Sequence, residues 1–302
     1  MVSIGLLGCG RIGQVHAQSL ARMKNARLTA VADFLPEAAE ALANASGAQV
    51  RSAEEIIAAL DIDAVIIATP TTLHYDQIHA LAHAGKAIFC EKPIDLSAER
   101  AVECMEIVEK TGTPFMTAFN RRFDPQFAHV QAQLAAGAIG QTELVVITSR
   151  DPAPPPVSYI EQSGGLFRDM MIHDFDMARF LLGEDPVEIY ATGSCLVDPA
   201  MGAAGDIETA MVTLRTAAGK LCQINNSRRA TYGYDQRIEV HGAKGMLQAA
   251  NQPENFVTRA GEGGFTGAPN KHFFLERYEA AYLAEMSAFI EALSSGTAPD
   301  PG

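Results

Sequence analysis

The chain has 302 residues, 48% of them hydrophobic and 20% charged, which are the proportions of an ordinary soluble globular protein long enough for two domains. Its formal net charge of −13 argues against a general affinity for nucleic acid or for an anionic membrane surface. No apolar run approaches the ~18 residues of a membrane-spanning helix, so we expect no membrane partner.

The chain begins with a pattern that is typical of dinucleotide binding. The apolar run Val2–Leu7 has the length of a buried parallel strand and leads directly into Gly8-Cys9-Gly10-Arg11-Ile12-Gly13, a G-x-G-x-x-G. A helical pattern follows over 12–23, then a second strand over 27–32 that ends at Asp33. In this arrangement the glycines allow close approach of pyrophosphate, the helix N-terminus faces the phosphates, and a carboxylate about 20 residues later binds the adenosine ribose.

Asp33 also indicates which dinucleotide is used. A carboxylate at this position accepts hydrogen bonds from a ribose 2′-hydroxyl and repels a 2′-phosphate. The next residues are Phe34 and Leu35, so no arginine follows that could hold such a phosphate. The sequence therefore predicts NAD rather than NADP as the cofactor.

Strands and helices alternate through the rest of the first domain. We expect helices over 36–48, 53–60, 75–84 and 97–111, and strands over 63–68, 87–91 and 114–119. Alternation of this kind predicts a doubly wound parallel sheet with helices on both faces, a Rossmann fold, and we place this dinucleotide-binding domain at 1–119.

A second motif, Cys90-Glu91-Lys92-Pro93, closes one of these strands. Ligands of an open parallel sheet lie at the carboxyl ends of its strands, so Lys92 can donate a hydrogen bond to a substrate hydroxyl. Pro93 can hold a cis peptide bond that fixes the direction of the lysine. The alternative interpretation is an ordinary turn with a solvated lysine.

After Phe119 the pattern changes to that of an α+β domain, which we place at 120–302. A helix that contains Phe127 is followed by strands expected over 142–149, 187–193, 209–215, 220–226 and 236–241, and a last helix is expected over 276–295. The segment 215–220 has the pattern of a hairpin connection, which indicates a mostly antiparallel sheet. Helices cover one face of this open sheet, and we expect a subunit partner to cover the other.

A third motif lies between the first two of these strands, in the run Gly164-Gly165-Leu166-Phe167-Arg168-Asp169-Met170-Met171-Ile172-His173-Asp174-Phe175-Asp176. A helix would place Asp169, His173 and Asp176 on one face. A carboxylate beside an imidazole makes a general base with a group that orients it. The alternative is an ion pair on a solvated helix surface.

Taken together, the glycine-rich start, Glu-Lys-Pro and Gly-Gly-(x)3-Asp-(x)3-His resemble the Gfo/Idh/MocA family of oxidoreductases over essentially the whole chain. The resemblance implies a homotetramer built through the open sheets. It also places Thr69 and Pro70 against the cofactor with His74 nearby, and we assign Glu91 to the same site. The alternative for His74 is a helix-capping or packed histidine. Members of the family usually continue into a further helix beyond the point where this sequence ends.

The resemblance implies NAD-dependent oxidation of a cyclic polyol, and myo-inositol to the 2-keto-inositol is the reaction that we expect. His173 is then the general base, Asp169 its orienting partner, and Lys92 a donor to the reacting oxygen. Asn120, Arg122 and Asp176 are candidates for binding other hydroxyls, although Arg122 could instead form a structural ion pair. The alternatives are another inositol stereoisomer or an aldose as substrate, or a non-catalytic NAD-binding regulator.

We expect no metal and no disulfide. The five cysteines are odd in number and lack a C-x-x-C, which fits reduced thiols in the cytoplasm. His79 and His83 have the spacing of a metal pair, but no third ligand is recognisable near them.

Overall fold

The protein, described by a computed structural model over residues 1–301 apart from the side chains at 161 and 162, divides into two compact units. One unit consists of Met1–Asn120 together with the segment from Ala281 to the C-terminus, and the other of Arg121–Ala280. The division after Asn120 falls at nearly the expected domain junction.

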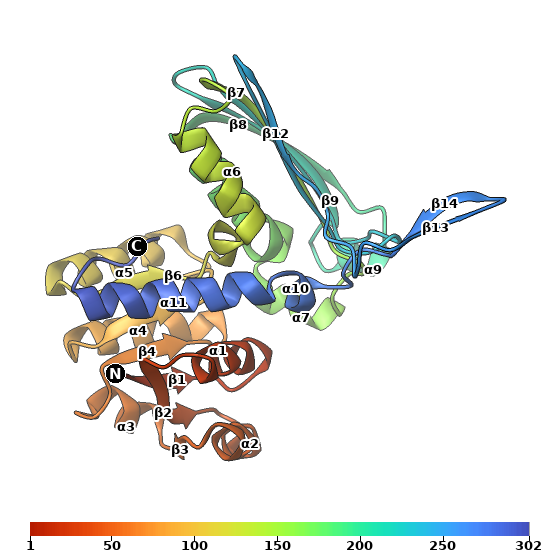
Figure 1. The fold of residues 1–302 in the computed structure, drawn as a ribbon. Helices are drawn as coiled ribbons and strands as arrows, with labels where there is room; N and C mark the ends of the chain where they lie inside the picture. Colours follow the sequence, from red (N-terminus) through yellow and green to blue (C-terminus); the bar gives the residue numbers. More distant parts are fainter. Residues whose placement is uncertain (302) are drawn as a thin grey trace. The chain divides into compact units, whose positions relative to one another are not determined.

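A six-stranded parallel sheet in the order β3-β2-β1-β4-β5-β6 forms the centre of the first unit (Figure 1). The strands are β1 (Val2–Leu7), β2 (Ala26–Ala32), β3 (Gln49–Val50), β4 (Ala64–Ile67), β5 (Ala87–Cys90) and β6 (Phe115–Thr117). The strand order reverses between β1 and β4, and ligands of doubly wound sheets bind at this switch point, beyond the carboxyl ends of the strands. The predicted Rossmann fold is confirmed.

Five helices connect these strands: α1 (Arg11–Ala21), α2 (Pro36–Ser46), α3 (Ala53–Ala58), α4 (His74–His83) and α5 (Ala98–Thr111). Their ends follow local signals that the sequence carries. Pro36 opens α2, where its missing N–H costs nothing, and the Ser97 hydroxyl accepts a hydrogen bond from Arg100 N at the start of α5. All five were predicted to within a few residues.

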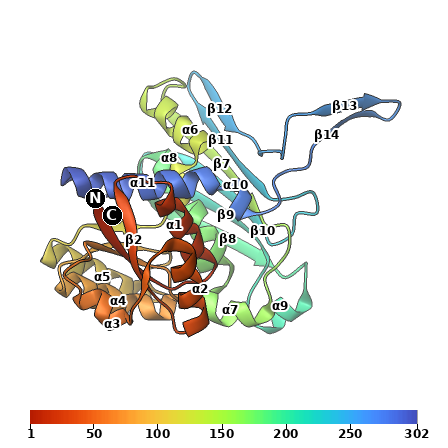
Figure 2. The same cartoon turned by 60° about the horizontal axis from the view of Figure 1, so that its bottom comes forward.

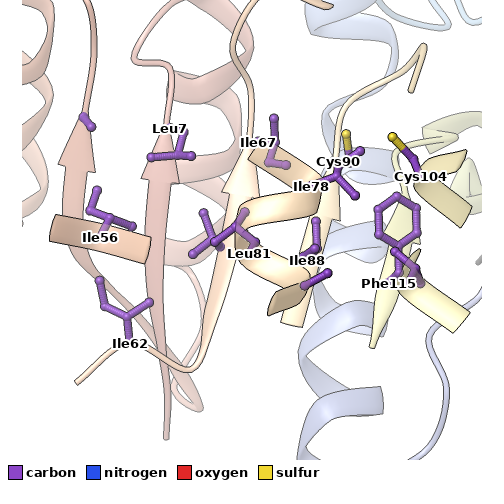
Figure 3. Close-up of a cluster of buried hydrophobic side chains, with 14 of the residues drawn as sticks. Leu7, Ile56, Ile62, Ile67, Ile78, Leu81, Ile88, Cys90, Cys104 and Phe115 are labelled. Carbon is purple, nitrogen blue, oxygen red and sulfur yellow. The ribbon is translucent and has the colours of Figure 1, made fainter. Parts of the chain in front are cut away.

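The core of the first unit lies on both faces of its sheet. Figure 3 shows one cluster, in which Ile88 and Cys90 of β5 lie near apolar side chains of α4 and α5. Phe89 points the other way, because successive side chains of a strand alternate between faces. Its ring contacts His16 of α1 and Phe289 of α11 (Glu279–Ser295) edge to face.

The contact between Phe89 and Phe289 shows that the expected domain boundary, which placed all of 120–302 in the second domain, needs correction. Most of α11 belongs to the first unit. Tyr282 and Phe289 of this helix pack on His16 and Phe89, and Thr117 N at the end of β6 donates to Pro301 O. The apolar side of α11 was evident from the sequence, but a helix pattern does not tell which core it completes.

The second unit contains a mixed six-stranded sheet in the order β12-β11-β7-β10-β9-β8. Its strands are β7 (Thr142–Arg150), β8 (Pro186–Ser194), β9 (Thr209–Thr216), β10 (Leu221–Ser227), β11 (Asp235–Gly242) and β12 (Gly245–Ala249). Only β7 and β10 pair in parallel, and β9 and β10 form the expected hairpin. The predicted mostly antiparallel sheet is confirmed, and β12 is an additional strand.

Helices cover one face of this sheet. α6 (Pro125–Ala135) packs on β12, and α8 (Ile172–Leu182) packs on β7 and β10. Residues of β9 alternate between buried and exposed, so its second face is open in the single chain. A separate hairpin of β13 (Thr258–Gly261) and β14 (Gly264–Gly267), which the sequence did not predict, projects away from the sheet (Figure 2). The short helices α7 (Val157–Ser163), α9 (Pro199–Ala203) and α10 (Phe274–Arg277) lie in the connections.

Candidate active site

The glycine-rich loop follows β1 and has a different requirement at each glycine. Gly8 has φ +95° and lies so close to the Ala68 carbonyl that a Cβ would collide with it. A Cβ on Gly13 would collide with the Gly8 carbonyl, so this glycine lets α1 start directly against the loop. A Cβ on Gly10 would meet nothing within 4 Å. The protein leaves open space at Gly10, where the motif brings its backbone up to a pyrophosphate.

The start of α1 suits an anion. Gly10 is the N-cap residue and its lack of a side chain leaves the first turn without a side-chain cap. The N–H groups of Arg11 and Ile12 belong to this turn, and the positive end of the helix dipole favours a phosphate there.

Asp33 lies directly after β2 and is bound to the loop. Its Oδ2 accepts a hydrogen bond from Cys9 N at 2.6 Å, and its Oδ1 accepts one from Leu35 N at 2.8 Å. Each carboxylate oxygen has a further lone pair, so the group can hold the loop and still accept bonds from a ribose. These features fit an NAD molecule on this edge of the sheet.

Two further loops at the carboxyl edge are joined through His74. The His74 side chain is 1% exposed, with Nδ1 2.9 Å from Pro93 O and Nε2 2.9 Å from Thr69 O. The Thr69 hydroxyl in turn donates a hydrogen bond to Gln77 Oε1 at 2.7 Å, and the exposed Pro70 precedes the 3₁₀ turn Thr71–Leu73. His74 is therefore a packed histidine that ties the loop after β4 to the loop after β5.

The Glu-Lys-Pro motif lies at the end of β5. Glu91 is buried, and its Oε1 lies 2.7 Å from Nε2 of His16, a completely buried residue of α1. Lys92 is half-buried beside it, and the Lys92–Pro93 peptide bond is cis, as expected. The pairing of Glu91 with His16 connects the glycine-rich segment to the lysine loop and was not predicted.

In the second unit, the expected helix around Asp169 and His173 departs from α-helical geometry. Residues Phe167–Met171 form a π-helical turn, and α8 begins only at Ile172. Asp169 therefore lies in the wider turn and His173 in the first turn of α8, and both are half-buried. π-turns inside helices occur frequently at functional sites.

Asp169 is held by two side chains that the sequence analysis missed. Both terminal nitrogens of Arg228 donate to Oδ2, at 3.2 and 3.3 Å, and Tyr159 Oη donates to Oδ1 at 3.1 Å. Arg228 follows β10 and is 2% exposed. An arginine beside a strand end gave no signal of its own, because its partner lies far along the chain.

Gly165 has a structural reason within the protein. A Cβ there would come within 2.6 Å of the Asp206 carboxylate, which accepts a hydrogen bond from Leu166 N. Asp206 thus occupies the space beside Gly165.

Two of the candidate substrate-binding residues pair with each other. Arg122 donates from Nε and Nη2 to the two oxygens of Asp176 at 2.8 and 2.6 Å, and its guanidinium lies 5.0 Å from the centre of the Phe180 ring. The ion pair that we considered as an alternative to substrate binding by Arg122 is therefore present. Asn120, the third candidate, is 4% exposed at the end of the first unit.

One more acid lies near Arg228. Asp151 directly follows β7, and burial raises its pKa to about 7, an effect that Arg228 opposes and Asp169 reinforces. Among the described residues we found no group of three metal-ligating side chains, and no described helix is long and apolar enough to cross a membrane. The five thiols are free of disulfide bonds.

A sheet of this order, with a glycine loop after the first strand and an acid after the second, defines a dinucleotide-binding domain. Two family models match the chain: the NAD-binding Rossmann fold of the GFO/IDH/MocA oxidoreductase family over residues 2–119, and the GFO/IDH/MocA C-terminal domain over residues 127–248. The chain therefore belongs to this family of NAD-dependent oxidoreductases.

Relatives and solved structures agree with this assignment. The inositol 2-dehydrogenase of Rhizobium meliloti is 56% identical over 295 residues, which cover 98% of this chain and 89% of the relative. The crystal structure of a myo-inositol dehydrogenase from Corynebacterium glutamicum is 43% identical, with a TM-score of 0.96 over 100% of this chain and 91% of that one. The scyllo-inositol dehydrogenase from Lactobacillus casei, solved with NAD(H) and scyllo-inositol, is 31% identical with a TM-score of 0.91 over 98% and 90% of the two chains.

Proposed function

We propose that this protein catalyses the NAD-dependent oxidation of myo-inositol to the 2-keto-inositol. The observation that carries the proposal is the 56% identity to an inositol 2-dehydrogenase over nearly the whole chain. Lys92, Asp169 and His173, the residues that the chemistry requires, are all present, which argues against a regulator that has lost its activity.

His173 is the general base of the proposed reaction. It takes the proton of the substrate hydroxyl as the carbon that bears it is oxidised to the ketone. An imidazole suits this role because its ordinary pKa of ~6.5 is close to the working pH. NAD, when bound, would supply the acceptor for the hydride that leaves this carbon.

Asp169 orients His173 and stabilises its protonated form. The carboxylate oxygen Oδ2 accepts both bonds from Arg228, whereas Oδ1 accepts a bond from Tyr159. An oxygen has two lone pairs, so Oδ1 can also accept a bond from the imidazole N–H. This role agrees with the position of Asp169 just before the start of α8.

Lys92 donates a hydrogen bond to the reacting oxygen and favours its alkoxide-like charge in the transition state. Asp176 and Arg122 bind other ring hydroxyls as a pair, since the carboxylate accepts hydrogen bonds and the guanidinium donates them. We assign Asn120 to the same task because its amide can both donate and accept.

For the cofactor, we propose that Gly8, Gly10, Arg11, Ile12 and Gly13 bind the pyrophosphate and that Asp33 binds the adenosine ribose. Thr69 and Pro70 contact the cofactor from the next loop. His74 and Glu91 contribute by fixing these loops, since both nitrogens of His74 lie beside backbone carbonyls and Glu91 is engaged by His16. Asp33 makes NAD the preferred cofactor over NADP.

We further propose a homotetramer located in the cytoplasm. The open face of the second sheet carries Tyr190, Met211 and Leu221, which are 71%, 49% and 42% exposed. Tyr190 pairs with Thr213 and Leu221 with Arg215, so these side chains share the face that Met211 occupies on β9. A subunit partner on this face would bury them. The unpaired thiols agree with a reducing compartment.

A screen of NAD reduction with purified protein tests the function. Myo-inositol, scyllo-inositol, other inositol stereoisomers and aldoses are compared at equal concentration. The proposal predicts the highest kcat/KM with myo-inositol. A higher kcat/KM with scyllo-inositol, the ligand of the Lactobacillus casei structure, would show that this stereoisomer is the preferred substrate. Absence of activity with every polyol, together with intact NAD binding, would favour a regulator.

A further inference from the structure

We propose that Arg228 is a positioning residue of this enzyme, which acts on the reaction by fixing the Asp169 carboxylate in one orientation and partly compensating its charge. The inference rests on the proposed role of Asp169 as the partner of His173. Arg228 itself is 2% exposed, and both of its terminal nitrogens converge on the single oxygen Oδ2 of Asp169.

The backbone of Arg228 is fixed by the second sheet. β10 runs parallel to β7, with Ser227 opposite Arg150, so Arg228 and Asp151 leave the sheet side by side. Asp151 N donates to Ser227 O at 2.9 Å, and Arg228 N donates to Glu208 O at 2.8 Å. The guanidinium therefore projects from an anchored position.

A second carboxylate lies beside the guanidinium. Asp206 Oδ2 lies 4.0 Å from Nη2 of Arg228, and this buried oxygen has no hydrogen-bond partner among the described residues. Its other oxygen binds Leu166 N, directly before the π-turn that carries Asp169. Arg228 thus lies between a carboxylate that holds the start of this turn and the carboxylate of Asp169.

The geometry of the Asp169 contact differs from that of a fork in which an arginine engages both oxygens of a carboxylate. Arg122 uses two nitrogens on two oxygens of Asp176, which engages the whole carboxylate. Arg228 uses two nitrogens on one oxygen of Asp169 and leaves the other oxygen to different donors. The carboxylate is therefore oriented and keeps an acceptor oxygen for an imidazole.

The charge of Arg228 sets the direction of a pH effect. The titratable groups around it are Asp169, Asp206 and Asp151, with Tyr159 on Asp169 and the Arg121–Asp174 pair beyond Asp151. Without the cation, the Asp169 carboxylate holds the protonated imidazole more strongly, which moves the onset of activity to higher pH.

The test compares Arg228→Gln and Arg228→Lys with the wild type. We expect Arg228→Gln to lower kcat for inositol oxidation by roughly 10–100-fold, as for a displaced catalytic group, and to move the acid limb of the kcat profile to higher pH. Arg228→Lys keeps the charge but not the two-nitrogen contact, so its acid limb should stay near that of the wild type while kcat falls. NAD binding should be unchanged in both variants.

Arg277→Gln is the matched control. Arg277 is another buried arginine of the same unit, and it pairs with the buried carboxylate of Asp124 rather than with Asp169. Its variant should lose thermal stability without a change in the pH profile. The proposal is overturned if Arg228→Gln has the acid limb and the kcat of the wild type. If the glutamine variant fails to fold, a wild-type kcat in Arg228→Lys overturns it instead.

A second readout separates this inference from the proposed function. The titration of the His173 ring is followed by NMR, with the His173→Ala spectrum as assignment. We expect its midpoint at higher pH in Arg228→Gln than in the wild type. If the wild type oxidises no polyol but the midpoint still moves, the substrate assignment is wrong and the role of Arg228 stands. An unmoved midpoint in an active, folded variant contradicts the role of Arg228.

Discussion

His16 and Glu91 form a buried pair that links the two cofactor motifs of the first unit. Nε2 of His16, on the helix after the glycine loop, lies 2.7 Å from Oε1 of Glu91, which directly precedes Lys92. The His16 ring is also enclosed by Phe89 and Tyr282. A substitution of either residue should therefore affect both motifs.

We expect His16→Ala to lower the free energy of unfolding of the first unit by about 1.5–3 kcal/mol, the scale of a lost hydrogen bond to a charged group. NAD affinity should fall as well, because α1 and the Glu91 loop lose their connection. Thermal unfolding with and without NAD measures both effects. His83→Ala, at an exposed position of α4, is the control and should change neither quantity.

Cofactor preference depends on Asp33. The wild type should prefer NAD to NADP by more than about tenfold in kcat/KM, because the carboxylate repels a 2′-phosphate. Asp33→Ala should reduce the preference and also weaken NAD binding, since it removes the acceptor for Cys9 N and Leu35 N. Asp33→Asn retains an acceptor and isolates the loss of charge. Equal use of both dinucleotides by the wild type contradicts the assignment.

Asp151 should make stability depend on pH. Its folded-state pKa of about 7 lies above that of an unfolded aspartate, so its favourable contribution is complete only below the unfolded pKa and is lost as pH rises towards 7. Asp151→Asn cannot ionise and avoids this loss. We therefore expect the variant's melting temperature, relative to the wild type, to be higher at pH 8 than at pH 4. An equal difference in melting temperature at the two pH values would show that the pKa of Asp151 is not raised in the folded protein.

The open sheet face should mediate assembly. We expect a tetramer by light scattering at micromolar concentration, and Met211→Glu with Tyr190→Lys should dissociate it, because charges would have to be buried at the contact. The matched control is Phe265→Ser, on the exposed β13–β14 hairpin rather than on the sheet. A monomeric mass for the wild type would show that the face needs no partner.

Much of the fold could be predicted because its signals are local. β1 is found where its apolar run lies, Val2–Leu7, since a parallel strand is buried on both faces and its sequence is continuously hydrophobic. Pro36 and the Ser97 cap mark helix starts in the same direct way. β3 was missed because Gln49–Val50 is a two-residue exposed strand with no apolar run.

The parts of the site that were missed depend on distant partners. Arg228 meets Asp169 from 59 positions away, and Arg122 meets Asp176 from 54 positions away, so no spacing rule reveals either contact. The π-turn at Phe167–Met171 was read as ordinary helix because its residues suit both geometries. The Asp169 and His173 motif was visible, but the arginine that holds it was not.

The most direct test of the account is the turnover of His173→Ala with myo-inositol. Removing a general base lowers turnover by roughly 10²–10⁴-fold, and we expect a loss in this range. NAD binding should remain nearly unchanged, because the glycine loop and Asp33 belong to the other compact unit. Lys92→Ala should also slow turnover without altering cofactor preference, and Asp169→Asn should slow it and change the pH profile. Near-normal turnover in His173→Ala, with the variant folded and NAD bound, would contradict the assignment of His173 as the base.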